Sequence, residues 1–156
     1  MSIAVIDYGS GNLKSVAKAL ELAVNNINAN SKIVVTSDPK IIKQSDKIVL
    51  PGQGSFRDCY LGIKKKLKLP HMGWNEIELK KDCFLFSNIK NKSHVYFIHS
   101  FEFMTKQKDC VIATTNYGNS IIVSVAKENI VGTQFHPEKS QKTGLIILEN
   151  FLKWKL

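Results

Sequence analysis

Arginine is almost absent from this 156-residue sequence: Arg57 is the only one, and lysine supplies the rest of the 22 basic side chains. Against 13 acidic residues they leave a net charge of +9. Bidentate recognition of phosphate and guanine depends on the planar guanidinium group of arginine. The lysines are also not interleaved with aromatic residues. We therefore expect a solvated lysine-rich surface, and nucleic-acid binding is the weakest of the functional hypotheses.

Long apolar runs and clustered cysteines are missing as well. No run of about 18 apolar residues is present, so we expect no membrane span. Cys59, Cys83 and Cys110 show neither metal-ligand nor redox spacing, and an odd count argues against a disulfide framework. The 44% share of hydrophobic residues predicts one globular domain over residues 1–156. The expectation is a cytoplasmic protein without a metal or cofactor.

The first half of the chain alternates predicted strands with predicted helices. Short apolar runs at 3–7, 32–36 and 47–50 indicate buried strands. After the first run, a helical stripe is formed by Leu13, Val16, Ala17, Leu20 and Val24. Pro39 opens a short helix, and a further helix is expected near Phe56. Such alternation implies parallel pairing with helical crossovers.

The second half of the chain is rich in predicted strands. They cover residues 74–79, 94–103, 110–117, 120–127 and 129–134. A hairpin turn is expected at 115–119, and a last helix at 143–155. The fold class predicted from the whole chain is therefore α/β, with a meandering β-rich second half.

His136 and Glu138 have the spacing of a general base and the carboxylate that orients it. Pro137 lies between them and fixes one backbone torsion. A carboxylate that holds one ring nitrogen leaves the other nitrogen facing a nucleophile. His-x-Glu triplets are also common in surface turns, which is the alternative interpretation of this one.

Two glycine-containing loops follow predicted strands. The loop at 51–54 has glycines that let backbone N–H groups point into a crevice, as an oxyanion hole requires. An ordinary tight turn is the alternative. Gly9 and Gly11 resemble a dinucleotide fingerprint only superficially, because Lys14 replaces the third glycine and no acidic residue ends the second strand. Dinucleotide binding is therefore not expected.

Five motifs occur in a fixed order: Asp-Tyr-Gly-Ser-Gly-Asn-Leu at 7–13, Leu-Pro-Gly-Gln-Gly-Ser-Phe at 50–56, Pro-His-Met-Gly-Trp-Asn at 70–75, Tyr-Phe-Ile-His-Ser-Phe at 96–101 and Gly-Thr-Gln-Phe-His-Pro-Glu-Lys-Ser at 132–140. Together they resemble the glutamine amidotransferase subunits of imidazole glycerol phosphate synthase, from Ile3 to Leu152. The resemblance implies a class I, flavodoxin-like fold. It also implies glutamine hydrolysis that supplies ammonia, in histidine biosynthesis, to a (β/α)₈ cyclase partner in a heterodimer.

The resemblance also implies roles for individual residues. His136 matches the general base and Glu138 its orienting carboxylate. The residues matched to the oxyanion strand are Gly52, Gln53 and Gly54, and those matched to backbone contacts with glutamine are Ser100 and Phe101. The residues matched to the face that docks on the cyclase are Asn12, Met72, Trp74, Tyr96 and Lys139. For the tryptophan and the tyrosine, core packing is the alternative.

The nucleophile of that family is absent from this sequence. The family carries a cysteine in a Gly-x-Cys-x-Gly elbow, and none of the three cysteines has such neighbours. The interval that would hold the elbow is only the nine residues 61–69. A strand, an elbow and a helix need roughly 30 residues. We therefore expect an internal deletion near 61–70 that removes a central strand–elbow–helix unit.

Three hypotheses follow from this absence. The chain is a glutaminase subunit without catalytic activity, a non-catalytic subunit that still docks on a cyclase, or an amidotransferase with an unrecognised nucleophile. Removing the nucleophile of a serine protease costs on the order of 10⁶-fold in rate. A similar loss favours inactivity here.

Overall fold

The computed structural model describes residues 1–9, 12–52 and 70–155. They fall into two compact units, Met1–Gln53 and Gly54–Leu156, each of which is described by itself. The helix expected near Phe56 and nearly all of the expected deletion at 61–70 lie outside the described residues. A single domain over residues 1–156 stays a prediction. Among the described residues, no helix is long and apolar enough to cross a membrane.

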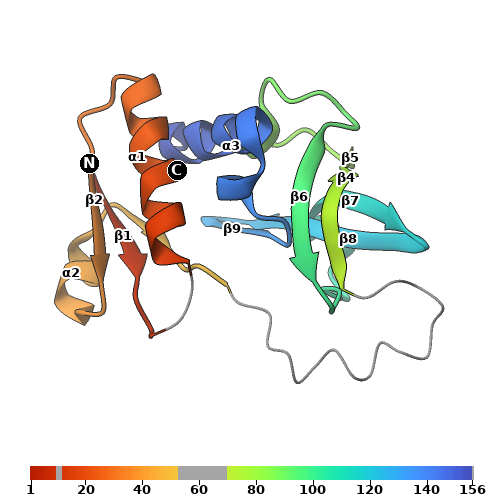
Figure 1. Cartoon of the computed structure of the whole chain (residues 1–156), viewed down its shortest axis with the longest axis horizontal. Coiled ribbons are helices and arrows are strands. Elements are labelled where there is room, and N and C mark those ends of the chain that lie inside the picture. Colours follow the sequence, from red (N-terminus) through yellow and green to blue (C-terminus); the bar gives the residue numbers. More distant parts are fainter. Residues whose placement is uncertain (10–11, 53–69, 156) are drawn as a thin grey trace. The chain divides into compact units, whose positions relative to one another are not determined.

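The first unit contains a parallel sheet with the strand order β2-β1-β3. Figure 1 shows the neighbouring strands β1 and β2. Its strands are β1 (Ser2–Ile6), β2 (Lys32–Thr36) and β3 (Lys47–Val49). The central strand β1 is paired on both sides, and Ile3, Ala4 and Val5 are fully buried. Burial on both faces explains why this strand is a continuous apolar run. The predicted parallel pairing is confirmed.

Two helices connect the strands of the first unit. Helix α1 (Leu13–Asn26) begins after Asn12, whose side chain accepts a hydrogen bond from a first-turn backbone N–H. Its buried residues include Leu20 and Val24, which belong to the predicted apolar stripe. Helix α2 (Pro39–Gln44) has its proline in the first turn, where the missing N–H costs nothing. Both predicted helices are confirmed.

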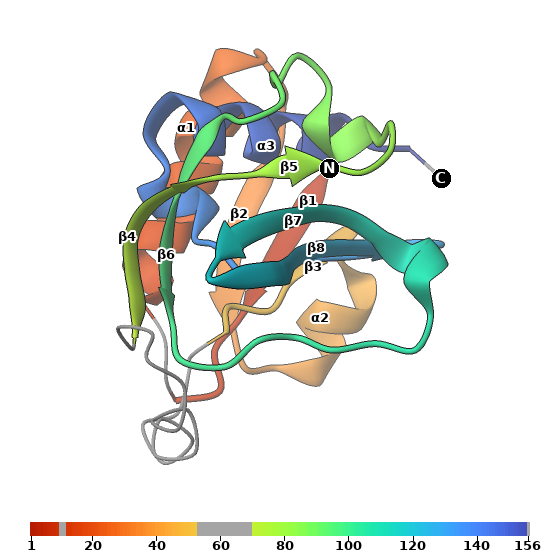
Figure 2. The ribbon, with the colours of Figure 1, turned by 90° about the vertical axis from the view of Figure 1, so that its right-hand side faces the viewer.

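The second unit is built from antiparallel strands, as the meandering pattern predicts. One sheet pairs β4 (His71–Glu76) with β6 (His94–His99), which lie side by side in Figure 2. The other has the order β5-β7-β8-β9, with β5 (Glu78–Leu79), β7 (Val111–Tyr117), β8 (Asn119–Lys127) and β9 (Ile130–Thr133). Gly118, with φ +72°, forms the turn of the predicted hairpin.

Two predicted strands have the wrong extent, and the first of them also begins three residues earlier than predicted, at His71. The predicted strand at 74–79 is two strands, because the backbone of the fully buried Ile77 bonds to the 92–93 turn and β5 then pairs with β7 instead of β6. The predicted strand at 94–103 ends at His99, and beyond it only Phe103 makes an isolated bridge, to Ile122. In both cases long-range pairing overrides the local apolar pattern.

Helix α3 (Gln141–Lys153) packs on the core of the second unit. Its residues Ile147 and Leu152 are buried, and Phe151 packs against the core cluster. The buried members of that cluster are Ile77, Leu85, Phe86, Val95, Phe97, Ile112, Ala113, Ile121, Val123, Phe135 and Ile147. The core thus joins both antiparallel sheets and α3 around the segment that carries His136.

Candidate active site

The imidazole of His136 and the carboxylate of Glu138 are hydrogen-bonded, with 2.9 Å between Nδ1 and Oε1. The two residues lie at a short 3₁₀ helix, η4 (Pro137–Lys139), which begins directly after His136. The carboxylate side chain is only 9% exposed, whereas the imidazole is 27% exposed. A neutral ring that donates from Nδ1 carries its lone pair on Nε2. This is the geometry of a base and its orienter.

The Glu138 carboxylate is held in its ionised form. Burial alone raises the pKa of Glu138. The hydrogen bond from His136, the backbone N–H of Glu138 and the charges of His136 and Lys139 lower it, and the net result is a pKa below the ordinary value. A charged carboxylate at neutral pH therefore faces the ring nitrogen and fixes its tautomer.

Ser140 holds the backbone at His136, a role that the sequence did not suggest. Its hydroxyl donates to the carbonyl oxygen of His136 at 2.7 Å and accepts from the N–H of Tyr96 at 2.9 Å. The His136 N–H in turn donates to the Tyr96 carbonyl oxygen at 2.9 Å. Ser140 is only 1% exposed and makes no cap to α3. In the sequence it resembles an ordinary N-cap serine, so its role could not be predicted.

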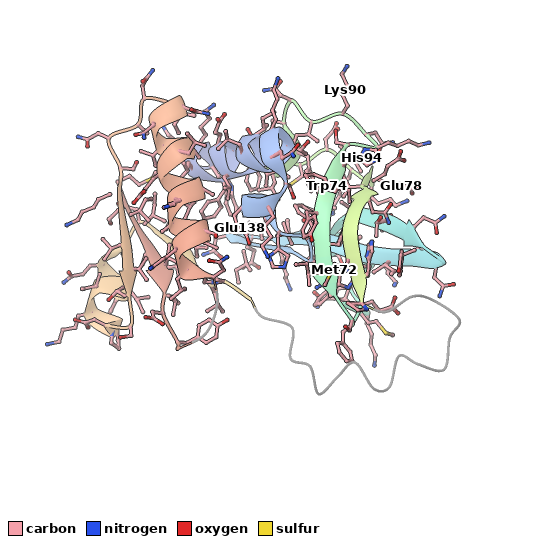
Figure 3. The ribbon with its side chains drawn as sticks, in the orientation of Figure 1. Met72, Trp74, Glu78, Lys90, His94 and Glu138 are labelled. Atoms are coloured by element: carbon pink, nitrogen blue, oxygen red, sulfur yellow. The ribbon has the colours of Figure 1, made fainter. Side chains whose placement is uncertain are left out.

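The predicted docking residues Met72, Trp74 and Tyr96 share one face of the β4–β6 pair. Trp74 is the register partner of Tyr96, and their rings meet edge to face at 5.7 Å. Met72 is 59% exposed and Trp74 is 45% exposed. Both side chains lie along β4 in Figure 3. Because nearly half of the Trp74 side chain is exposed, core packing is excluded for it. Met72, Trp74 and Tyr96 together form an apolar surface strip.

The other two predicted docking residues have different surroundings. Lys139 ends η4, directly after Glu138, and is half-buried. Asn12 lies in the first unit, where its side-chain oxygen accepts from the N–H of Ser15 at 3.3 Å. The structure thus gives Asn12 a capping role in α1.

The predicted oxyanion strand is described only at its first residue. Gly52 follows β3 and is exposed, whereas Gln53 and Gly54 lie outside the described residues. The phenol of Tyr8 donates to the carbonyl oxygen of Pro51. Because β1 and β3 are neighbours, this bond ties the loop after one strand to the loop after the other. In the sequence, Tyr8 is marked by its place after the first predicted strand and within the motif at 7–13, and neither predicts this bond.

Ser100 and Phe101 follow β6, the same strand to which His136 is bonded. Ser100 is half-buried, and Phe101 is 38% exposed. The carbonyl oxygen of Phe101 accepts from Nδ1 of His99 at 2.7 Å. The second unit therefore contains the His136–Glu138 pair, the predicted glutamine contacts and the apolar strip.

The described cysteines do not sit at a strand-to-helix elbow. Cys83 and Cys110 are half-buried and form no disulfide. Cys83 precedes a short 3₁₀ helix (Phe84–Phe86). Cys110 ends another 3₁₀ helix (Lys108–Cys110), and its thiol donates to the Gln107 carbonyl oxygen. Cys59 lies outside the described residues. Within residues 1–9, 12–52 and 70–155, no group of three His, Cys, Asp or Glu residues could hold a metal ion.

Comparisons of the sequence point to one family. The family model described as glutamine amidotransferase class-I matches residues 54–154. The HisH subunit of imidazole glycerol phosphate synthase of Azospirillum brasilense is 37% identical over 190 residues, covering 99% of each chain. The HisH subunit of Pelagibacter ubique is 40% identical over 210 residues, covering 97% of this chain and 99% of its own. Since 190 aligned positions exceed 156 residues by 34, at least that many positions have no counterpart here.

Solved structures share the fold. A GMP synthase-type protein of Thermoplasma acidophilum superposes with a TM-score of 0.70 at 19% identity, covering 97% of this chain and 92% of its own. A glutamine amidotransferase of Thermotoga maritima gives 0.59 at 13% identity, covering 92% and 78%. The predicted α/β fold of the class I glutamine amidotransferase type is thereby confirmed.

Proposed function

Because this chain belongs to the class-I glutamine amidotransferases, among the HisH subunits of imidazole glycerol phosphate synthase, we propose that it is the glutaminase-type subunit of such a synthase, in histidine biosynthesis, and that it has lost its catalytic activity. Its partner is a cyclase subunit with a (β/α)₈ barrel, and the family's substrate is glutamine. We place it in the cytoplasm and expect no cofactor.

The observation that carries the proposal is the bond between His136 Nδ1 and Glu138 Oε1. With Glu138 ionised, the imidazole presents a basic Nε2, which is suited to take a proton from a thiol. The resulting thiolate would attack the carboxamide carbon of glutamine, and protonated His136 would return its proton to the leaving nitrogen, so that ammonia departs as the C–N bond breaks and the thioester forms. Water would then hydrolyse the thioester and release glutamate. Ser100 and Phe101, at the end of the same strand pair, are the proposed backbone contacts to glutamine.

The thiol for that step is what the chain lacks. No cysteine stands in a Gly-x-Cys-x-Gly pattern, and at least 34 positions of a HisH relative are missing. We assign the missing segment to the interval near 61–70, where the family's strand, elbow and helix would stand. Without a thiolate no thioester forms, and an intact base does not compensate.

Glutamate release from glutamine tests the loss of activity. The purified chain is assayed with the cyclase subunit of a HisH-containing synthase present, and we expect no release above background. Release that His136→Ala abolishes and His94→Ala preserves would overturn the proposal. His94 is a suitable control because it lies on β6 with its side chain 59% exposed.

A non-catalytic docking subunit is the second candidate, favoured by the exposed Met72 and Trp74 beside Tyr96. A pull-down with the cyclase tests docking. A complex without glutamate release supports this candidate, and the absence of a complex removes it together with the proposed cyclase partner. An unrecognised nucleophile would instead show as a cysteine labelled by a glutamine-mimicking electrophile. Resequencing the gene around codons 60 to 70 tests the deletion itself.

A further inference from the structure

Two buried histidines, His71 and His99, are separate from the His136–Glu138 pair. They are register partners on β4 and β6, and they are 4% and 7% exposed. Nδ1 of His71 lies 2.9 Å from Nε2 of His99. Because successive side chains of a strand face opposite sides, this pair occupies the buried face of the ribbon whose other face presents Met72 and Trp74. Nothing in the base-and-orienter geometry uses these two rings.

The hydrogen bonds of the two rings can run in only one direction. The Phe101 carbonyl oxygen can only accept, so Nδ1 of His99 must donate across the 2.7 Å between them. In a neutral ring Nε2 of His99 is then an acceptor, and His71 must donate to it from Nδ1. Nε2 of His71 is left as an acceptor for the Asn75 amide, 3.2 Å away. The chain thus runs from Asn75 through both rings to a backbone carbonyl.

Both rings are held neutral, which this direction requires. Burial, with a smaller contribution from the charge of His99, lowers the pKa of His71 to about 4. For His99, burial lowers the pKa and the charge of His136 acts in the same sense, while the bond to Phe101 and the charge of Glu102 act against them; the net pKa is lowered. At neutral pH each ring therefore carries one proton, on Nδ1.

Aromatic stacking fixes the orientation of the first ring. His71 stacks on Phe97 with ring centroids 4.4 Å apart and on Tyr117 with centroids 4.0 Å apart, at interplanar angles of 16° and 17°. Two nearly parallel contacts leave the imidazole only its own plane for hydrogen bonding. In that plane lie the bonds to His99 and Asn75.

We propose that His71 and His99 are positioning residues: a one-way chain of imidazole hydrogen bonds that holds the Phe101 carbonyl, and with it the glutamine-contacting residues Ser100 and Phe101, on the β4–β6 pair. The role in glutamine contact rests on the proposed function, whereas the series of hydrogen bonds through His71 and His99 does not. Uptake of a proton by either ring turns both of its nitrogens into donors and breaks the chain. Among the residues that the structure describes, the titratable groups beside the pair are Tyr117 at His71, and His136 and Glu102 at His99.

The tautomers of the two rings provide the first test. Nitrogen NMR of the full chain at neutral pH is expected to show both His71 and His99 protonated on Nδ1 and not on Nε2. Assignments come from the His71→Phe and His99→Phe variants, each of which removes one ring's signals. A ring protonated on Nε2, or a charged ring at neutral pH, would overturn the proposal. This readout needs no glutamine and is independent of the proposed function.

A pair of substitutions at His99 separates positioning from packing. His99→Phe retains an aromatic ring and removes both hydrogen bonds, whereas His99→Gln retains an amide that can donate to the Phe101 carbonyl and accept from His71. We expect backbone amide exchange at residues 100–104 to become about tenfold faster in His99→Phe, because the bond to the Phe101 carbonyl is the one of the two that holds this segment, and largely to recover in His99→Gln. His94→Gln, at the exposed end of the same strand, is the matched control.

Two results would overturn the positioning role. One is slow amide exchange that is retained in His99→Phe and lost in His99→Gln, and the other is equal exchange in every variant. If His99→Phe does not fold, two measurements still test the proposal. They are the amide exchange of His99→Gln compared with that of the unaltered protein, and the tautomers of the two rings. Binding of L-glutamine, followed by the same amide signals, is then compared between the two variants. If His99→Phe loses exchange protection but the unaltered protein does not bind L-glutamine, the result counts against the proposed function. The hydrogen-bonded pair of imidazoles would still be supported.

Discussion

A Cβ atom added to Gly144 would lie 1.9 Å from the carbonyl oxygen of Pro137. The same atom would lie 2.8 Å from the Cβ of Ser140. Only a glycine therefore lets the first turn of α3 rest directly on the turn that carries His136 and Glu138. The position of the candidate base depends on the absence of a side chain one helical turn after Ser140.

Gly144→Ala is expected to destabilise the protein. Alanine is the better helix former by about 1 kcal/mol. A backbone carbonyl cannot rotate away from the new methyl group, however, and overpacking of this kind costs about 1–3 kcal/mol or more. Chemical denaturation should therefore show a net loss. Gly132→Ala is the matched control, because its Cβ would meet Val125 at an ordinary 3.5 Å; equal stability of the two variants would contradict the prediction.

Ser140→Ala should destabilise the protein and disturb the His136 ring. The change leaves the N–H of Tyr96 without its acceptor in a part-buried setting, which costs about 1–3 kcal/mol. Ser93→Ala also removes a serine hydroxyl bonded to a carbonyl, that of Lys90, but at a more exposed site. There we expect at most about 0.5 kcal/mol. Denaturation of both variants checks the difference, and similar losses would argue against a special role for Ser140.

Stability should fall as the pH drops from about 6.5 toward 4. In that interval the unfolded chain protonates His71 and the folded chain, with a pKa of about 4, does not. The unfolded state therefore binds more protons, and stability rises with pH. The contribution is at most roughly 3 kcal/mol. Urea denaturation at several pH values measures it. His71→Phe should flatten the slope and His94→Gln should not; an unchanged slope in His71→Phe would contradict the assignment.

Trp74→Ala should weaken binding to the cyclase subunit. A half-exposed tryptophan on an apolar strip is the kind of residue that carries binding energy, about 2 kcal/mol or more, which is at least roughly 30-fold in Kd. Ile130→Ala is the control, since Ile130 is 70% exposed on β9 and outside the strip. Calorimetric titration of both variants checks the prediction. Equal affinities would remove the strip from the interface.

Thermal unfolding is expected to be broad. The proposed deletion removes a strand from the middle of the family's sheet, so neighbouring strands lose partners and a void results. Calorimetry of the purified monomer should show a van't Hoff enthalpy below the calorimetric one. A chain that carries the missing segment of the Pelagibacter ubique relative is the control and should melt more sharply. A sharp two-state melt of the present chain would contradict this prediction.

Local patterns in the sequence were enough for the three α-helices that the structure describes, for most strands and for the pairing of His136 with Glu138. The apolar run at residues 3–7 predicts a buried strand because a strand covered on both faces needs apolar side chains throughout. His136 and Glu138 could be paired in advance because they lie two residues apart around a proline. The predicted contacts at Gln53 and Gly54 lie outside the described residues, and their roles stay predictions.

Contacts between distant residues were decided only by the tertiary structure. The bond between Tyr96 and Ser140 joins residues 44 positions apart, and the bond between His71 and His99 joins residues 28 apart. Each depends on strand register, and a slip of one residue would turn every side chain of a strand to the opposite face. The order of residues along the chain specifies which chemical groups are present and most of the local structure. Cross-strand pairing and the packing of α3 decided which of those groups meet, because that choice depends on the free energy of the whole folded core.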